Sequence, residues 1–177
     1  MANLFAVVRA IAMQTDTHDY TAVEYRDALL GRLQATLRAQ EIAANHEAAD
    51  FEGLLRQSVG DAGEGRLDCT GVAIQVPSSR VLAISMILHE LGTNALKYGA
   101  WSVAGGRVHV TWAVEEGLEE ASDLVCEWRE IGGPPVSLPS RRGYGTELIE
   151  GTSAHIGGRV ELHYHPDGLS ASIQIPL

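Results

Sequence analysis

The chain has 177 residues and 45% hydrophobic content, enough for one ordinary domain with a core and a small appendage. Its net charge of −10 argues against nucleic acid, whose phosphates would be repelled. No stretch approaches the length of a membrane span, and the N-terminus lacks the basic start and cleavage site of a signal peptide. The sequence therefore predicts a cytoplasmic protein without membrane contact, in which Cys69 and Cys126 are buried, reduced thiols.

The first part of the chain is predicted to be helical. Apolar residues recur at helical spacing over 3–15, and Thr21 with Glu24 forms a capping box before an apolar stripe of Leu30, Leu33 and Leu37. Two helices cannot bury both stripes alone, so we expect a hairpin that pairs with a second copy into a four-helix bundle. The alternative is that the stripes pack on the rest of the same chain.

The rest of the chain is predicted to mix helices and strands. A third helix is expected at about 48–59, followed by a loop over 60–65. Strand-like apolar runs occur at 66–70, 72–76, 107–114, 124–128, 159–164 and 169–175. The last two are joined by a turn of Pro166, Asp167 and Gly168, which predicts a closing hairpin.

A helix predicted from about residue 78 to residue 98, with Gly99 as its left-handed stop, carries the strongest functional pattern. Glu90, Asn94 and Lys97 recur at intervals of four and three residues, which places them on one helix face. An amide oxygen is a hard ligand for Mg²⁺, a lysine meets phosphates as a point charge, and a carboxylate can accept a proton. The pattern fits a magnesium–nucleotide site, although an amphipathic surface helix gives the same spacing.

An acid and two glycines follow one of the predicted strands. Glu130 stands near the end of the strand-like run, before Gly132 and Gly133. Paired glycines let the backbone approach a flat ligand while the carboxylate accepts from an exocyclic amine. In isolation this segment is equally typical of an ordinary loop.

Two more glycines open a helix that is predicted to run to about residue 155. Gly143 and Gly145 would expose backbone N–H groups to an anion at this helix N-terminus. The neighbouring Arg141 and Arg142 would add phosphate donors. Each of these signals is weak alone, and their occurrence in one order along the chain is more informative.

In this order the motifs resemble those of the HWE histidine kinases of two-component signalling. His89 stands in the text HELGTNALKYGAWS, Trp128 and Glu130 stand in WREIGGPPV, and the third glycine segment reads RRGYGTELIEG. The resemblance covers nearly the whole chain. It implies an α+β fold in which a helical dimerisation hairpin, over 1–44, precedes a Bergerat-type α/β sandwich, the catalytic ATP-binding domain, over 45–177.

The resemblance also implies a function. The chain would be a histidine kinase core that takes the γ-phosphate of Mg-bound ATP, with His89, Glu90 and Asn94 as catalytic residues and Asn94 as the Mg²⁺ ligand. It would act as a homodimer joined by the N-terminal helices, with an upstream sensor domain and a response-regulator receiver domain as partners. The implied ATP-binding residues are Asn94, Lys97, Tyr98, Glu130, Gly132, Gly133, Arg141, Arg142, Gly143, Gly145 and Thr146.

The chain departs from the family pattern in three places, one of which is Trp101 where a leucine is expected. The phosphoacceptor histidine of the family would precede Met1, so we expect Met1 to lie inside a longer kinase; a natural short protein that binds ATP without phosphorylating itself is the alternative. His18 is the candidate substitute for the missing phosphoacceptor, but its sequence context predicts a residue in a loop or at a helix end. Gly92 replaces an expected alanine, which lowers the helix propensity at this position by about 1 kcal/mol and would loosen the helix.

Two other functions are compatible with the same motifs. One is a non-catalytic phosphotransfer or scaffold protein, whose relatives are expected to lose the asparagine or the glycine segment that this chain retains. The other is a serine kinase of the anti-sigma-factor type, which would lack the N-terminal hairpin. His163 and His165 lie on one side of the closing hairpin, but without a third ligand nearby they do not predict a zinc site.

Overall fold

A computed structural model describes residues 21–116, 122–136 and 144–177. The predicted helix over 3–15 and His18 lie outside these residues. The helices of the described part are α2 (Ala22–Asn45), α3 (Phe51–Val59), α4 (Ser78–Lys97) and α5 (Tyr144–His155), with two short 3₁₀ turns, η1 (Gly60–Gly63) and η2 (Ala100–Ser102).

The strands form one large and one small sheet. The small sheet pairs β1 (Ala48–Asp50) with β3 (Gln75–Pro77). The large sheet has the order β2-β4-β5-β7-β6, in which only the β2 and β4 pair is parallel. Its strands are β2 (Leu67–Gly71), β4 (Arg107–Glu116), β5 (Ser122–Ile131), β6 (Arg159–His165) and β7 (Gly168–Pro176).

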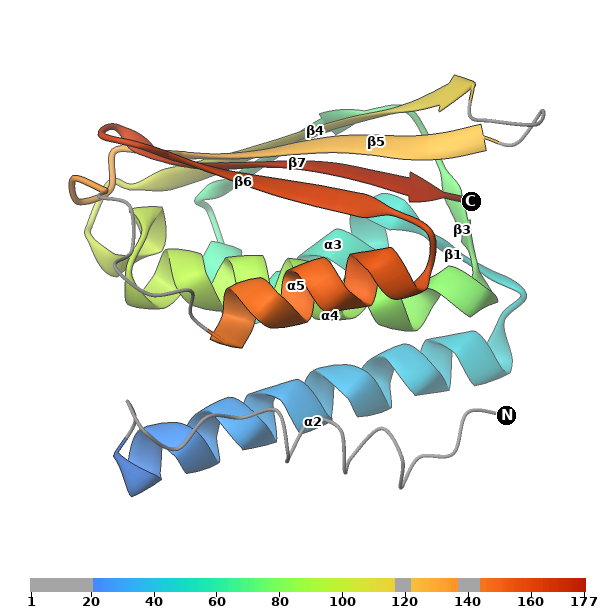
Figure 1. Cartoon of the computed structure of the whole chain (residues 1–177), viewed down its shortest axis with the longest axis horizontal. Helices are drawn as coiled ribbons and strands as arrows, with labels where there is room; N and C mark the ends of the chain where they lie inside the picture. The colour runs from blue at the N-terminus through green and yellow to red at the C-terminus, as the bar shows by residue number, and fades with distance from the viewer. Residues whose placement is uncertain (1–20, 117–121, 137–143) are drawn as a thin grey trace.

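The described elements are arranged in three layers (Figure 1). The five-stranded sheet is covered on one face by α3, α4 and α5, and α2 lies against α4 on the side away from the sheet. Alternation along β4 turns Val108, Val110 and Trp112 inward and leaves the other face of the sheet polar and exposed. The core between the sheet and the helices holds Trp128, which packs edge-on against Trp101 with ring centroids 5.7 Å apart.

The start of the third helix was predicted three residues too early. Residues 48–50 form β1, and α3 begins at Phe51. Asp50 is the N-cap, since its carboxylate accepts a hydrogen bond of 2.8 Å from the Gly53 N–H. Helical periodicity does not distinguish this short strand, because its formation depends on pairing with β3, 25 residues or more further along the chain.

The leucine stripe of α2 is not the face that packs. Leu30 and Leu37 are 46% and 47% exposed, whereas Ala35, Thr36 and Ala39 are buried. Small residues on this face let α2 approach α4 closely; a Cβ added at Gly31 would lie 3.4 Å from Nε2 of His89. α2 therefore packs on its own chain through the face of small residues, and the alternative that its leucine stripe packs there is wrong.

Gly92 in α4 and Gly99 just after α4 have roles that differ from the predicted ones. Gly92 is buried where a Cβ would meet Cγ1 of Val59 at 3.2 Å, so it permits close packing of α3 on α4. Gly99 has φ −108°, which is outside the left-handed region, so the predicted left-handed stop is wrong. Its missing side chain instead makes room for the carboxylate of Glu130.

Candidate functional site

One cavity brings together most of the residues predicted from the α4 pattern. It has a volume of about 150 Å³ and is lined on α4 and its C-terminal end by His89, Glu90, Thr93, Asn94, Lys97 and Tyr98. Glu90 is buried, Asn94 is half-buried, and Lys97 is exposed at the end of the helix. The spacing of four and three residues therefore places an acid, an amide and an amine on one cavity wall.

Gly145 approaches this wall from the first turn of α5. A Cβ at position 145 would lie 3.1 Å from Oε2 of Glu90 and 3.7 Å from the side-chain amide of Asn94. Glycine therefore lets the N-terminus of α5, where backbone N–H groups are unpaired by the helix, come next to the acid and the amide. Of the other residues predicted here, Thr146 lies in α5 but not on the cavity wall, and Arg141, Arg142 and Gly143 lie outside the described residues.

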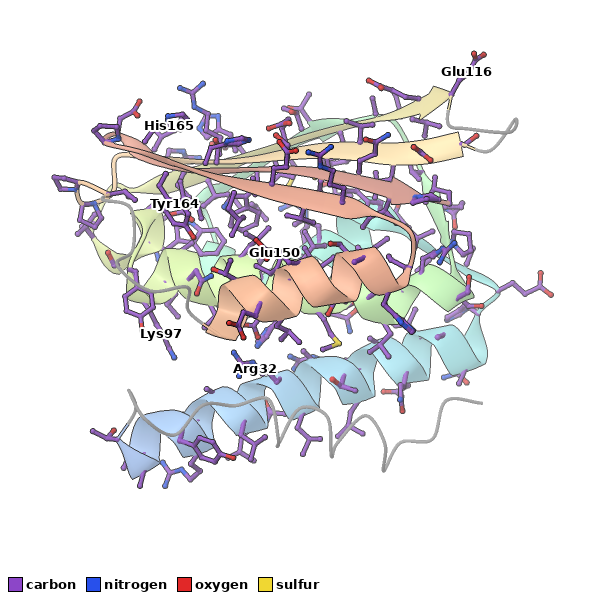
Figure 2. The ribbon with its side chains drawn as sticks, in the orientation of Figure 1. Arg32, Lys97, Glu116, Glu150, Tyr164 and His165 are labelled. Atoms are coloured by element: carbon purple, nitrogen blue, oxygen red, sulfur yellow. The ribbon has the colours of Figure 1, made fainter. Side chains whose placement is uncertain are left out.

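The opposite wall comes from α2, which the sequence analysis did not connect with the site. Asp27, Ala28, Gly31 and Arg32 line the cavity. Arg32 projects from α2 toward α4 (Figure 2), and its Nε and Nη2 donate to the two oxygens of Glu90 at 2.7 and 2.9 Å. A single charged residue within a face of small residues, including Ala28, Ala35 and Ala39, was the available sequence signal for this contact.

His89 lines the cavity and is also held against α3. Its Nδ1 lies 3.3 Å from the carbonyl oxygen of Ser58, which can only accept, so the Nδ1 nitrogen is the protonated one. Burial lowers the pKa of His89, while the neighbouring Glu90 carboxylate and the Ser58 hydrogen bond act in the opposite direction. The neutral ring is therefore the form that the fold favours.

This burial predicts a loss of stability in acid. Because the folded pKa of His89 is lowered, the unfolded chain binds more protons below about pH 6.5, and the free energy of unfolding falls with pH by up to about 1.4 kcal/mol per unit. The contribution is complete above pH 6.5 and is lost toward lower pH. Urea unfolding between pH 5 and pH 8 is expected to show a flatter profile for His89→Gln, whereas His46→Gln, at an exposed position, should follow the unsubstituted chain. Parallel profiles for all three would contradict this assignment.

Glu130 lies beyond the wall of this cavity, under the loop that follows α4. Its Oε2 accepts from the Ala100 N–H at 2.7 Å, and its Oε1 accepts from Nε1 of Trp128 at 3.3 Å. Only 3% of Glu130 is exposed, and this burial raises its pKa, against the effect of the two hydrogen bonds. Glu130 thus ties the end of β5 to η2, and it does not line the cavity of Glu90 and Asn94.

The two glycines after Glu130 lie next to the same loop. Gly132 has φ +71°, a conformation that side chains disfavour, so glycine is required at this turn. A Cβ at Gly133 would lie 2.8 Å from Cα of Ala100, so this glycine permits close backbone packing. Both residues shape the loop contact, and neither lines the cavity of Glu90 and Asn94.

A substitution at Gly99 tests this close packing. Gly99→Ala would place a methyl group on the Glu130 carboxylate, and overpacking of this kind is expected to lower the free energy of unfolding by about 1–3 kcal/mol. Gly151→Ala is the matched control, because nothing lies within 4 Å of its missing Cβ and alanine favours the helix. Urea titration should show the first variant less stable and the second unchanged or more stable; equal stability of Gly99→Ala and the unsubstituted chain would contradict the packing.

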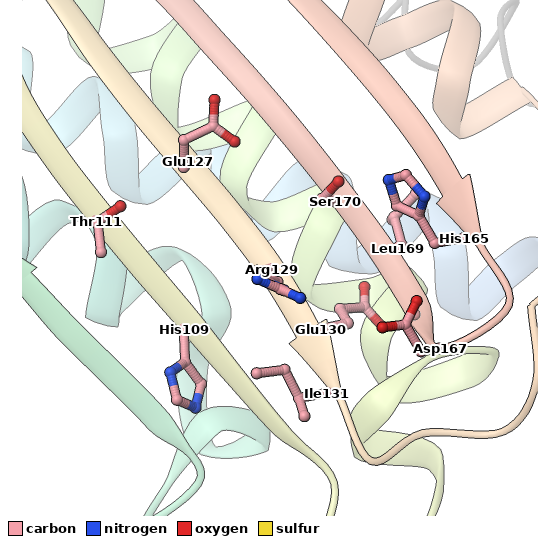
Figure 3. A pocket seen from close by; sticks show the side chains of 11 residues that line it. His109, Thr111, Glu127, Arg129, Glu130, Ile131, His165, Asp167, Leu169 and Ser170 are labelled. Carbon is pink, nitrogen blue, oxygen red and sulfur yellow. The ribbon is translucent and has the colours of Figure 1, made fainter.

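A larger hollow of about 640 Å³ lies on the opposite, outer face of the sheet. Its lining includes His109, Thr111, Glu127, Arg129 and His165 (Figure 3), which extend from β4, β5 and β6 with the helices behind them. Of the predicted site residues, Glu130 lines it, but none of the residues from the α4 or α5 patterns does. We therefore assign the function to the smaller cavity, where the acid, the amide and the amine converge.

Comparison with known proteins relates the chain to one group of kinases. The family model of HWE histidine kinases matches residues 1–73. Blue-light-activated histidine kinase 1 of Erythrobacter litoralis is 34% identical over 185 residues, which span 99% of this chain and 50% of that protein. These matches support an HWE histidine kinase. The resemblance to this family stated from the sequence is thereby confirmed.

Other HWE-kinase relatives and solved structures agree. A blue-light-activated histidine kinase of Rhizobium johnstonii is 29% identical across 98% of this chain and 50% of that protein, so the chain spans about half the length of these two relatives. The histidine kinase domain of Erythrobacter litoralis EL346 has a TM-score of 0.62 at 14% identity and covers 98% of this chain and 92% of that domain. At that identity the likeness shows a shared fold. Within the described ranges, no helix is long and apolar enough to cross a membrane.

Proposed function

We propose that the cavity between α2, α4 and the start of α5 is the phosphate end of a Mg–ATP site, and that the chain is the core of a two-component histidine kinase. The observation that carries the proposal is the convergence of Glu90, Asn94, Lys97 and Gly145 on one cavity in a chain of the HWE family. The fold around it is proposed to be the Bergerat-type ATP-binding sandwich.

The residues on the cavity wall fit a magnesium-bound phosphate. The site offers the hard amide oxygen of Asn94, the carboxylate of Glu90 and the amine of Lys97, and Gly145 leaves the space that a Cβ would fill. A volume of about 150 Å³ is below the roughly 300–1,000 Å³ of sites for drug-sized ligands, so it suits one end of a nucleotide. The purine end is proposed to lie toward Glu130, Gly132 and Gly133, on the strength of the family motif.

Each residue would have a separate role. Bound Mg²⁺ would neutralise phosphate charge. Asn94 would hold it, Lys97 and Tyr98 would lie along the phosphate and ribose, and Glu90 would accept a proton from the attacking group. Catalysis by this chain's residues would be mainly positioning and charge neutralisation. From the family motif, His89 is also placed with the catalytic residues, Glu130 with adenine, and Arg141, Arg142, Gly143 and Thr146 with the phosphates.

The N-terminal helices are proposed to form a separate dimerisation unit, over 1–44, with the catalytic domain over 45–177. Exposed Val23, Leu30 and Leu37 recur every seven residues on α2 and leave an apolar stripe for a second copy, while the opposite face packs on α4. The phosphoacceptor histidine is proposed to precede Met1, between a sensor domain and this chain, and the aspartate of a response-regulator receiver domain would receive the phosphoryl group.

Labelling with γ-³²P ATP tests this function. The chain, extended by the coding sequence before Met1, is expected to become labelled in the presence of Mg²⁺, and the label should be lost in acid and kept in base, as is typical of phosphohistidine. Acid-stable label would instead indicate the serine kinase of the anti-sigma-factor type. Absence of label together with absence of ATP binding would indicate the scaffold protein.

A further inference from the structure

Arg32 is a buried, charged residue of α2, a helix to which the proposed function assigns no catalytic role. It is 8% exposed, and its partner Glu90, 58 residues further along the chain, is 3% exposed. The other buried residues of this α2 face are small or neutral, namely Ala35, Thr36 and Ala39. The helix therefore brings one cation to α4, and brings it to the acid that lies one turn before Asn94.

The contact fixes the orientation of the Glu90 carboxylate. Nε donates to Oε1 at 2.7 Å and Nη2 donates to Oε2 at 2.9 Å, which is the two-point geometry specific to a planar guanidinium. Each carboxylate oxygen retains a second lone pair outside this fork. Oε2 is also the oxygen nearest the space left by Gly145. The fork thus holds the carboxylate in place without using all of its acceptor capacity.

Holding α2 against α4 does not by itself explain why Arg32 and Glu90 form a buried ion pair. Removing two charges from water is costly, and a buried ion pair adds little net stability compared with apolar residues of similar size. The same helix face packs through Gly31 and the two alanines without any charge. A charged pair at the place where α2 meets the cavity is better explained by what it does for Glu90.

We propose that Arg32 is a positioning residue for Glu90, so that α2 completes the catalytic site and Glu90 works only while α2 is docked in this register. This inference rests on the proposed function of the cavity. A shift of α2 by one residue would move Arg32 by about 1.5 Å along the helix and turn it by about 100°, which breaks both bonds of the fork. Movement of the N-terminal helices would thereby be coupled to catalysis through one ion pair.

The test compares Arg32→Ala, Glu90→Gln and the double variant in the extended protein that contains the phosphoacceptor. Arg32→Ala is expected to slow phosphohistidine formation by about 100-fold while the Kd for Mg–ATP stays unchanged, since a small misplacement of a catalytic group lowers rate without removing ligand contacts. When Glu90→Gln is already present, adding Arg32→Ala should cause no further loss in the rate of phosphohistidine formation. Arg56→Ala removes the exposed pair with Glu52 and serves as the matched control with the unsubstituted rate.

Two further measurements separate positioning from folding. Arg32→Lys keeps the buried charge but lacks the fork, so it is expected to fold and still be slow. In urea unfolding without nucleotide, the effects of Arg32→Ala and Glu90→Gln should be non-additive, because both break the same pair. If the unsubstituted protein becomes labelled and Arg32→Ala or Arg32→Lys is labelled equally fast, the positioning role of Arg32 is overturned while the proposed function stands. If the unsubstituted protein neither binds ATP nor becomes labelled, the proposed function and this inference both fall.

Discussion

Replacing Asn94 by alanine is expected to abolish Mg²⁺-dependent ATP binding. Asn94 is the one neutral amide oxygen on the proposed phosphate wall, between Glu90 and Lys97. Magnesium usually takes only one or two protein ligands, so the loss of one removes much of the protein's hold on the ion. Because loss of a partner outside the ligand shell already lowers metal affinity about 10- to 100-fold, Asn94→Ala should weaken binding by more than about 100-fold. Calorimetric titration of Mg–ATP into the variant measures this change in affinity.

Asn45→Ala is the matched control for this substitution. It removes the same side chain from an exposed position at the end of α2, outside the cavity. Its Kd for Mg–ATP should equal that of the unsubstituted chain. Retained tight binding by Asn94→Ala would refute the assigned role of Asn94 and, with it, the location of the magnesium ion.

Glu90→Gln is expected to separate binding from catalysis. The amide has nearly the same shape but cannot accept the proton of the attacking group, so phosphohistidine formation should slow by about 100- to 10,000-fold, the usual contribution of a general base. Mg–ATP binding should persist, because the Asn94 and Lys97 side chains remain. Rapid-quench labelling and calorimetry on the same preparation give the two quantities, and an unchanged labelling rate would remove Glu90 from the mechanism.

The same substitution has a large expected effect on stability. Glu90→Gln removes the carboxylate charge from the buried pair with Arg32, and breaking a buried pair in this way lowers the free energy of unfolding by about 3–5 kcal/mol. The exposed pair of Glu52 with Arg56 is the control, since Glu52→Gln should change stability by less than about 1 kcal/mol. Equal effects at the two sites in urea titration would mean that the Arg32 and Glu90 charges are not buried together.

Local patterns in the sequence were sufficient for the elements that carry the site. The face shared by Glu90, Asn94 and Lys97, the strands β4 and β5, and the closing hairpin all follow from periodicities within one segment. Gly145 of α5 was identified for the same reason, and it does lie next to Glu90 and Asn94.

The features that sequence analysis missed all depend on contacts between distant segments. The Arg32 contact joins residues 58 apart, and no periodicity within α2 identifies its partner on α4. Gly99 was assigned a left-handed conformation from its place after a helix, whereas its role is set by the approach of Glu130 from β5. The face of small residues through which α2 packs on α4 was not identified, because close approach of two helices, and not an apolar stripe, selects it.

Hydrogen exchange with and without Mg–ATP tests the central claim most directly, because it reports where the nucleotide binds. We expect Mg–ATP to slow exchange in α2 around Arg32, in α4 from His89 to Lys97 and in the first turns of α5, the segments that line the proposed site. Exchange in β4 around His109 and Thr111, which line the outer hollow, should be unaffected. Protection confined to the hollow around His109 and Arg129, or no protection anywhere, would contradict the account.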